Sequence, residues 1–165
     1  IMHRSMEQAE QVAKEYQRIF GDDFYLELMR HRTDDPGMNK LVFDDQVYVN
    51  EVLNRLARKH DLKVVATNDA HFVDKDDASA HDRLICIGTA SDLDDPRRMR
   101  YTRQEWFKTQ DEMKALFADI PEAIINTQEV ADKVEAYELN HKPIMPEFTI
   151  PGEFEDADAY LKHIS

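Results

Sequence analysis

The chain has 165 residues, which suits one domain or one domain with an appendage and excludes a multidomain enzyme on this chain alone. Its 42% hydrophobic and 33% charged residues allow a buried core in water, so a disordered tail or a fibre is excluded. The net charge of −13 repels nucleic acid, and contact with a phosphate backbone therefore requires a local basic patch or a neighbouring domain.

The first predicted element is an amphipathic helix. Ser5 and Gln8 form a capping box, apolar residues follow at helical spacing, and Gly21 ends the pattern. A strand is predicted at residues 24–29, where apolar side chains alternate along the chain. A turn is predicted at residues 35–37, because aspartate, proline and glycine follow one another there.

The next two elements are a helix and a second strand. The helix has an acidic start at Asp44 and Asp45 and carries an apolar stripe, and the strand is the short apolar run at residues 63–67. The order helix, strand, helix, strand favours a parallel sheet with helices on its outside. The sequence therefore predicts an α/β fold.

The pattern changes after Asp69. A helix is predicted at about residues 76–87, and an irregular stretch follows it. Thr109 and Glu112 form a capping box at the start of another helix. Pro121 suits the first turn of the helix after that one.

An extended linker is predicted beyond residue 140, and Asp156 is predicted to cap a helix of a following domain. The prolines of this linker are Pro143, Pro146 and Pro151. We therefore divide the chain into a domain at residues 1–140 and a linker with the start of the next region at residues 141–165. Because the chain opens on Ile1 and stops within the last helix, we interpret it as a piece of a longer protein.

Membrane and secretion signals are not seen in the sequence. No apolar run approaches the roughly 20 residues that cross a bilayer, and the amino terminus lacks the pattern of a signal peptide. The single cysteine, Cys86, cannot form an internal disulfide and reads as a buried small hydrophobe. We therefore expect a reducing compartment, the cytoplasm, and no membrane partner.

Asp69 and His71 are the strongest candidate site residues. They follow the apolar strand at residues 63–67, and in an extended chain their side chains point the same way at its carboxyl end. Ligand sites in α/β folds lie at that end, and a carboxylate with an imidazole can bind a divalent metal. Zinc needs at least three protein ligands, so these two do not close a site. The alternative is a helix N-cap aspartate beside an exposed histidine.

The first strand offers His31 as a third candidate metal ligand. His31 is near the carboxyl end of the strand, whereas Glu27 lies four residues earlier, about 13 Å away in an extended chain, so one metal cannot bind both. We expect Glu27 to be a buried partner of a basic side chain or a hydroxyl. The alternative for His31 is a loop histidine in solvent.

Other polar side chains receive structural interpretations. His81 shares a helical face with Leu84 and Ile85, and we expect a hydrogen-bonded packing residue. One arginine cluster can contact a phosphate backbone or a neighbouring domain, or it can pair with loop aspartates, and we favour the pairing. The arginines are Arg97, Arg98, Arg100 and Arg103, and the aspartates are Asp92, Asp94 and Asp95. No glycine-rich phosphate loop, nucleophile elbow or cysteine pair occurs in the sequence, and we assign no catalytic residue.

Five stretches carry a family resemblance. They are Phe24-Tyr25-Leu26-Glu27-Leu28, Lys63 to Phe72, Ala80-His81-Asp82, Leu93-Asp94-Asp95-Pro96 and Leu116 to Ala123. In this order they resemble the alpha-subunit family of bacterial replicative DNA polymerase III, the C family of polymerases. The matching region is the later part of the amino-terminal polymerase-and-histidinol-phosphatase (PHP) domain, and the resemblance spans nearly the whole chain.

The resemblance implies a fold and a metal site. The fold would be part of a distorted seven-stranded (β/α) barrel, followed by helices and an extended linker toward the polymerase palm. Asp69 and His71 match the last metal-binding motif of the PHP domain, and His31 lies where metal-retaining relatives often have histidine. The cofactors implied are zinc, manganese or magnesium in an intact PHP domain and magnesium for the parent polymerase. In this fragment we expect a weak partial site or no bound metal.

Three functions are compatible with the resemblance. The first is a fragment of a polymerase that acts on DNA with other replisome subunits, its PHP domain being a scaffold or a metal-dependent 3′–5′ proofreading phosphoesterase. The fragment itself is then expected to be inactive. The second is an interaction module with a relic metal site, and the third is a free-standing PHP phosphatase. Because part of a barrel exposes sheet edges and apolar surface, the fragment is also predicted to self-associate.

Overall fold

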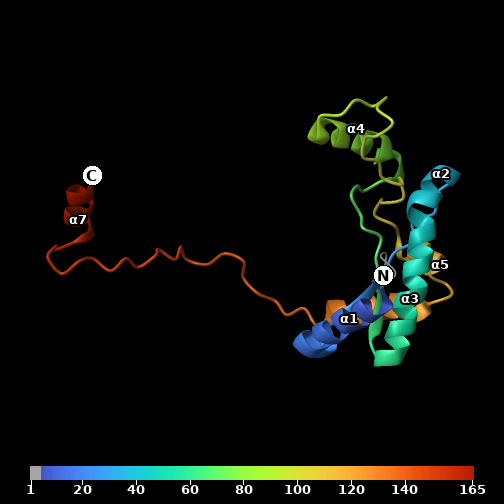
Figure 1. The fold of residues 1–165 in the computed structure, drawn as a ribbon, viewed down its shortest axis with the longest axis horizontal. Coiled ribbons are helices and arrows are strands. Elements are labelled where there is room, and N and C mark those ends of the chain that lie inside the picture. The colour runs from blue at the N-terminus through green and yellow to red at the C-terminus, as the bar shows by residue number, and fades with distance from the viewer. Residues whose placement is uncertain (1–4) are drawn as a thin grey trace. The chain divides into compact units, whose positions relative to one another are not determined.

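The structure is a computed structural model that describes residues 5–165, with one compact unit up to Val134 and a second from Glu135 to Ser165 (Figure 1). In the first unit the elements are α1 Met6–Phe20, β1 Tyr25–Leu28, α2 Pro36–Met38, α3 Asp44–His60, β2 Lys63–Ala66, α4 Ala78–Thr89, α5 Gln110–Leu116 and α6 Pro121–Asp132. The second unit contains α7, Ala157–Ile164, after a stretch of extended chain.

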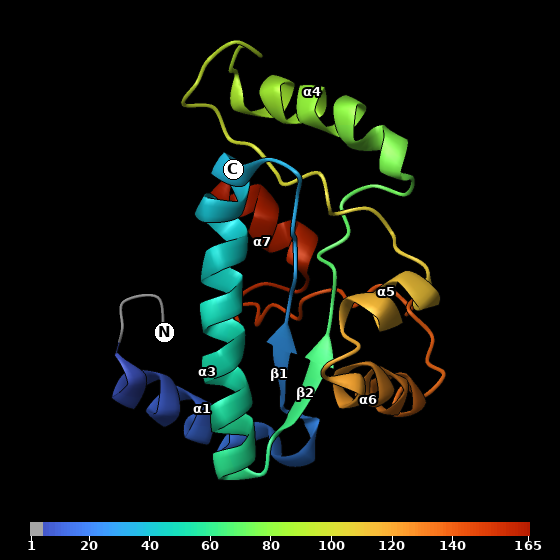
Figure 2. The ribbon, with the colours of Figure 1, turned by 90° about the vertical axis from the view of Figure 1, so that its right-hand side faces the viewer.

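The two strands form a parallel pair, as the sequence predicts. Tyr25 lies opposite Lys63 and Leu28 lies opposite Ala66, and both arrows point the same way in Figure 2. Helix α3 connects the strands, which is the crossover that a parallel pair requires. The carboxyl ends of β1 and β2 therefore meet at one edge, and the loops that leave this edge carry the candidate site residues.

Helices pack on both sides of the strand pair and close the core. Helix α3 packs against β1, and α6 lies along β2 (Figure 2). Leu28 on β1 and Phe117 after α5 have no exposed surface, and Ala123 on α6 is equally buried. Burying large apolar side chains such as Leu28 and Phe117 stabilises the fold by about 1.5–3 kcal/mol each.

The predicted turn at residues 35–37 is wrong, because these residues begin a helix. Asp35 is the N-cap, its Oδ1 accepting hydrogen bonds from the backbone of Gly37 at 2.8 Å and Met38 at 3.2 Å, and Pro36 occupies the first helical position. The helix then passes through a wider π turn, Asn39–Phe43, into α3. Proline is favoured at the first helical position, since the missing N–H would be unpaired there in any case.

The predicted caps of α5, α6 and α7 are confirmed, and so is the Ser5 half of the predicted Ser5–Gln8 capping box. Thr109 and Glu112 each accept a hydrogen bond from the other's backbone at the start of α5, and Pro121 lies in the first turn of α6. The Ser5 hydroxyl accepts from the backbone of Gln8 at 3.4 Å, and Asp156 caps α7. These contacts stabilise helix ends by about 1 kcal/mol each.

The α/β class is confirmed for the residues described, whereas the seven-stranded barrel stays a prediction. Residues 5–134 hold a two-stranded parallel sheet with helices around it. The compact units divide after Val134, and the division into domains at residues 1–140 and 141–165 also stays a prediction, with residues 1–4 outside the described part. Within residues 5–165, no helix combines the length and the apolar character needed to cross a membrane.

Candidate metal site

Asp69 and His71 lie side by side beyond the carboxyl end of β2. Asp69 Oδ2 is 3.4 Å from His71 Nε2, and both side chains are partly open to solvent. Two ligands on one tetrahedral ion, each about 2.1 Å from it, are also about 3.4 Å apart. The pair therefore has the spacing of two neighbouring ligands of a divalent metal.

The reason for this closeness differs from the one that the sequence suggests. Strand β2 ends at Ala66, so the alternation of side chains along a strand does not apply to Asp69 and His71. Instead Asp69 has a left-handed backbone, with a φ of 45°, and the backbone N–H of His71 donates to the carbonyl oxygen of Glu105 at 2.8 Å. A left-handed residue is uncommon outside glycine, although aspartate tolerates it better than most side chains.

The Asn68 side chain fixes the loop that carries the pair. Its amide nitrogen donates to the carbonyl oxygens of Gln104 at 2.9 Å and of Trp106 at 2.7 Å. Its Oδ1 accepts a hydrogen bond from Lys108 Nζ at 3.1 Å. Lys108 also lies 3.5 Å from the centre of the Trp106 ring, and partial burial lowers the pKa of Lys108 to about 8. The segment after β2 is thus held to the segment before α5.

His31 is buried at the same edge of the sheet, so the alternative of a loop histidine in solvent is wrong. Only 4% of its surface is exposed. Its Nε2 lies 3.1 Å from the carbonyl oxygen of Asn68, and its Nδ1 lies 3.1 Å from the amide nitrogen of Gln46. Both ring nitrogens therefore have protein partners, and the role of His31 as a metal ligand stays a prediction.

Glu105 is a buried carboxylate beside His31 that the sequence analysis did not single out. Its Oε1 accepts hydrogen bonds from the backbone of Thr102 at 3.0 Å and from the Thr102 hydroxyl at 2.5 Å. The same oxygen is 3.8 Å from His31 Nδ1. The other oxygen, Oε2, is buried and has no hydrogen-bond partner among residues 5–165. No motif marks this residue, because its burial depends on the fold of a loop.

Aromatic rings surround His71. The ring of His81, on α4, lies 5.5 Å from that of His71, and the ring of Tyr101 lies 4.6 Å from it, edge to face. Phe72 lies 5.1 Å from His81. The packing role predicted for His81 is confirmed, although the sequence did not indicate that it packs on His71, and no hydrogen bond of its ring is found among residues 5–165. No pattern in the sequence linked Tyr101 to this position.

The arginine cluster is paired, but its main partner differs from the predicted loop aspartates. Arg98 binds both carboxylate oxygens of Asp82 on α4, at 2.6 and 2.8 Å, and these hydrogen bonds lower the pKa of Asp82. Arg97 lies 3.7 Å from Asp95 in the predicted manner, with Arg97 almost fully exposed. Arg98 reaches α4 because the loop folds back over that helix. No local sequence pattern predicts this path of the loop.

Glu27 pairs with a hydroxyl, as predicted, but it is exposed rather than buried. Its Oε1 accepts a hydrogen bond of 2.6 Å from the Thr67 hydroxyl. Leu26 and Leu28 on either side of it face the core, so Glu27 lies on the other face of β1. The burial prediction fails because that face of the strand is open around Glu27 in the described chain.

The residues present fit a divalent cation as a partial site. A carboxylate and an imidazole of suitable spacing come together at Asp69 and His71, and a second imidazole and an orphaned carboxylate oxygen lie behind the same loop. Mixed oxygen and nitrogen donors suit zinc and manganese. Within residues 5–165 no group of three or more histidine, cysteine, aspartate or glutamate side chains is arranged to hold a metal. The role of Asp69 and His71 as metal ligands therefore stays a prediction, and so does the identity of a third ligand.

The known proteins that this chain matches include DNA polymerase III alpha subunits. The chain is 40% identical over 153 residues to DNA polymerase III subunit alpha of Campylobacter jejuni, and 38% identical over 152 residues to that of Borreliella burgdorferi. It is 36% identical over 161 residues to the subunit of Helicobacter pylori. These matches cover 91–97% of this chain but 12% of each relative, and no family model matches the sequence. The resemblance to DNA polymerase III alpha subunits is confirmed.

Proposed function

Because nearly the whole chain is a relative of one segment of bacterial DNA polymerase III alpha subunits, we propose that it is a part of such a subunit. The activity proposed for the whole protein is template-directed synthesis of DNA during replication, with magnesium as cofactor. Its partners would be DNA and other replisome subunits. The chain spans 12% of the relatives' length, so this fragment is proposed to contribute a module and not the polymerase reaction itself.

Within the subunit, the segment is proposed to belong to the PHP domain and to contribute metal ligands. The observation that carries this assignment is the 3.4 Å approach of Asp69 Oδ2 to His71 Nε2 at the carboxyl ends of two parallel strands. Active sites of α/β barrels lie at these ends. His31 is proposed as a further ligand from the neighbouring strand end.

The chemistry proposed for the intact site is phosphoester hydrolysis. When bound, a divalent metal would activate a water molecule and neutralise charge on a phosphate oxygen. The residues of this chain hold that centre in place: Asp69 and His71 present their donors, and Asn68 fixes the loop between them and β2. The rings of His81 and Tyr101 limit the positions open to the His71 imidazole.

The direct test uses a longer chain, in which the preceding part of an alpha subunit is fused to the amino-terminal end of this one. Bound zinc and manganese are measured by mass spectrometry for the wild type, for Asp69→Asn and for the exposed-loop control Asp94→Asn. We expect bound metal in the wild type and the control and a several-fold loss in Asp69→Asn. Hydrolysis of a mismatched 3′ primer end should follow the metal content. Equal metal in all three proteins contradicts the assignment.

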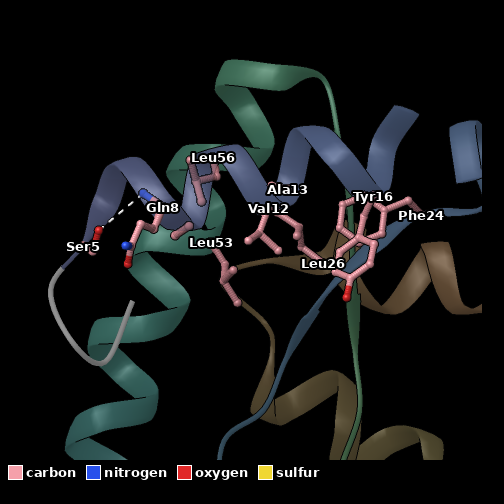
Figure 3. Close-up of a pocket in the computed structure, with 10 residues that line it drawn as sticks. Ser5, Gln8, Val12, Ala13, Tyr16, Phe24, Leu26, Leu53 and Leu56 are labelled. Carbon is pink, nitrogen blue, oxygen red and sulfur yellow. Dashed lines mark hydrogen bonds between the residues drawn. The ribbon is translucent and has the colours of Figure 1, made fainter. Parts of the chain in front are cut away.

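An interaction module is the second candidate, and a specific surface favours it. Helix α1, β1 and α3 line an open apolar groove of about 370 Å³, drawn in Figure 3. Val12 and Tyr16 are about half exposed there. Apolar grooves of this kind are typical of surfaces that another protein segment covers. If the longer chain binds no metal in any variant, the module is structural and its metal ligands are relics.

A further inference from the structure

The hydrogen bonds of His31 define which of its ring nitrogens carries the proton. The backbone N–H of His31 donates to Gln46 Oε1 at 2.7 Å, and this contact fixes the orientation of the Gln46 amide. The amide nitrogen of Gln46 then faces His31 Nδ1 at 3.1 Å as a donor, so Nδ1 must accept. The proton is therefore on Nε2, which donates to the carbonyl oxygen of Asn68 at 3.1 Å.

The ring of His31 is oriented with Nε2 toward the loop that carries the proposed metal ligands. Asn68 immediately precedes Asp69, and its carbonyl oxygen occupies the direction in which Nε2 points. A histidine binds a metal through a nitrogen that has a free lone pair. For Nε2 to bind, the ring has to carry its single proton on Nδ1 instead, with no change in its charge.

A proton on Nδ1 needs an acceptor, and Glu105 is the group placed to provide one. The Gln46 amide nitrogen is itself a donor and cannot accept. Glu105 Oε1 lies 3.8 Å from Nδ1, close enough to form a hydrogen bond after a shift of about 1 Å. Thr102 anchors that carboxylate through two hydrogen bonds, and Glu105 is only 2% exposed.

The burial of Glu105 has no explanation in packing alone. A buried carboxylate oxygen without a partner is costly, yet Oε2 has none among residues 5–165. Metal-ligating histidines commonly donate their other ring nitrogen to a carboxylate, which orients the ring. A glutamate beside the ring nitrogen that faces away from the strand-end loop fits that arrangement.

We propose that Glu105 is a positioning residue for His31: the Glu105 carboxylate accepts a hydrogen bond from Nδ1–H when His31 presents Nε2 to a divalent metal at Asp69 and His71. This inference rests on the proposed metal site and adds a residue that supports one of its ligands. Gln46 and Glu105 thus stabilise alternative tautomers of one imidazole. Glu105 itself makes no contact with the metal.

The experiment follows the His31 tautomer in the longer chain of the metal-binding test by long-range proton–nitrogen NMR, with zinc chloride alone as the probe. We expect the Nε2-protonated form without zinc and the Nδ1-protonated form at saturation. Glu105→Gln should raise the apparent zinc dissociation constant about tenfold, as outer-shell changes do. The exposed helix variant Glu122→Gln is the matched control and should leave it unchanged.

Gln46→Ala is a second variant, and it is expected to favour the Nδ1-protonated tautomer. It removes the donor that favours the resting tautomer, so it should raise the Nδ1-protonated fraction before zinc is added. A general folding defect would not both weaken zinc binding in Glu105→Gln and raise the Nδ1-protonated fraction in Gln46→Ala. The inference is overturned if His31 keeps its Nε2 proton at zinc saturation, or if Glu105→Gln binds zinc as the wild type does. If the His71 signals shift while those of His31 do not, the proposed metal site stands without Glu105; if neither shifts, both fail.

Discussion

The amide nitrogen of Asn68 donates a hydrogen bond of 2.7 Å to the backbone carbonyl oxygen of Trp106. This bond joins the loop after β2 to the segment before α5, which lie far apart in the sequence. The loop carries Asp69 and His71, and the segment carries Glu105. The geometry of the candidate site therefore depends on a side chain that touches neither the metal nor a substrate in the proposed function.

Asn68→Ala is expected to destabilise the chain by about 2 kcal/mol, because three hydrogen bonds are lost and two carbonyl oxygens lose a donor. Urea unfolding followed by circular dichroism measures the change. Asn54→Ala on α3 is the control. It should alter the free energy of unfolding by less than about 0.5 kcal/mol. A similar loss in both variants would show that Asn68 does not have this special role.

Asp82→Asn is expected to remove a pH-dependent part of the stability. The hydrogen bonds from Arg98 lower the pKa of Asp82 in the folded chain below the ordinary value of an aspartate. The carboxylate therefore stabilises the fold above about pH 4, and this contribution is lost as the pH falls through the lower folded pKa. The wild type should exceed Asp82→Asn by about 2 kcal/mol at pH 6, and the two should converge toward pH 2. A difference that stays constant across this range would contradict the account.

Arg30→Lys is expected to lower the stability by about 1 kcal/mol. The Arg30 guanidinium binds both oxygens of Asp119, at 2.5 and 2.8 Å, and donates to the carbonyl oxygen of Leu116. Lysine cannot make the two parallel hydrogen bonds. The exposed Arg32→Lys is the comparison, and thermal unfolding of both variants measures the effect. Equal melting temperatures for the two variants would rule out a role for the Arg30 contacts in holding the end of β1.

The isolated chain is expected to self-associate through the groove of α1, β1 and α3 (Figure 3). Val12→Asp places a charge in that groove, so it should shift the chain toward monomer in light scattering. Ile87→Asp changes an apolar residue on α4 that is more exposed than Val12, at 78% against 50%, and should leave the association unchanged. A monodisperse wild-type monomer in light scattering would contradict self-association through this groove.

The sequence predicts the regular elements well because their signals are local. Each signal determines the structure of only a few neighbouring residues. Examples are the capping pair Thr109 and Glu112, the proline at 121 and the alternating apolar residues of β1. The helix that begins at Pro36 is missed, since aspartate, proline and glycine suit a turn as well as a helix start.

The site is predicted only in part, because its geometry comes from contacts between distant segments. Asp69 and His71 are found from their place after a strand, although a left-handed residue and not the strand brings them together. Glu105 and Tyr101 reach the site through the loop before α5. No sequence pattern specifies how that loop folds back.

The most direct test of the metal site is an anomalous difference map from crystals of the longer chain, which includes the upstream alpha-subunit sequence, soaked in manganese or zinc chloride. The account predicts a peak about 2.0–2.3 Å from both the Asp69 carboxylate and His71 Nε2. Peaks confined to other parts of the surface, or no peak between these two side chains at full soaking concentration, would contradict it.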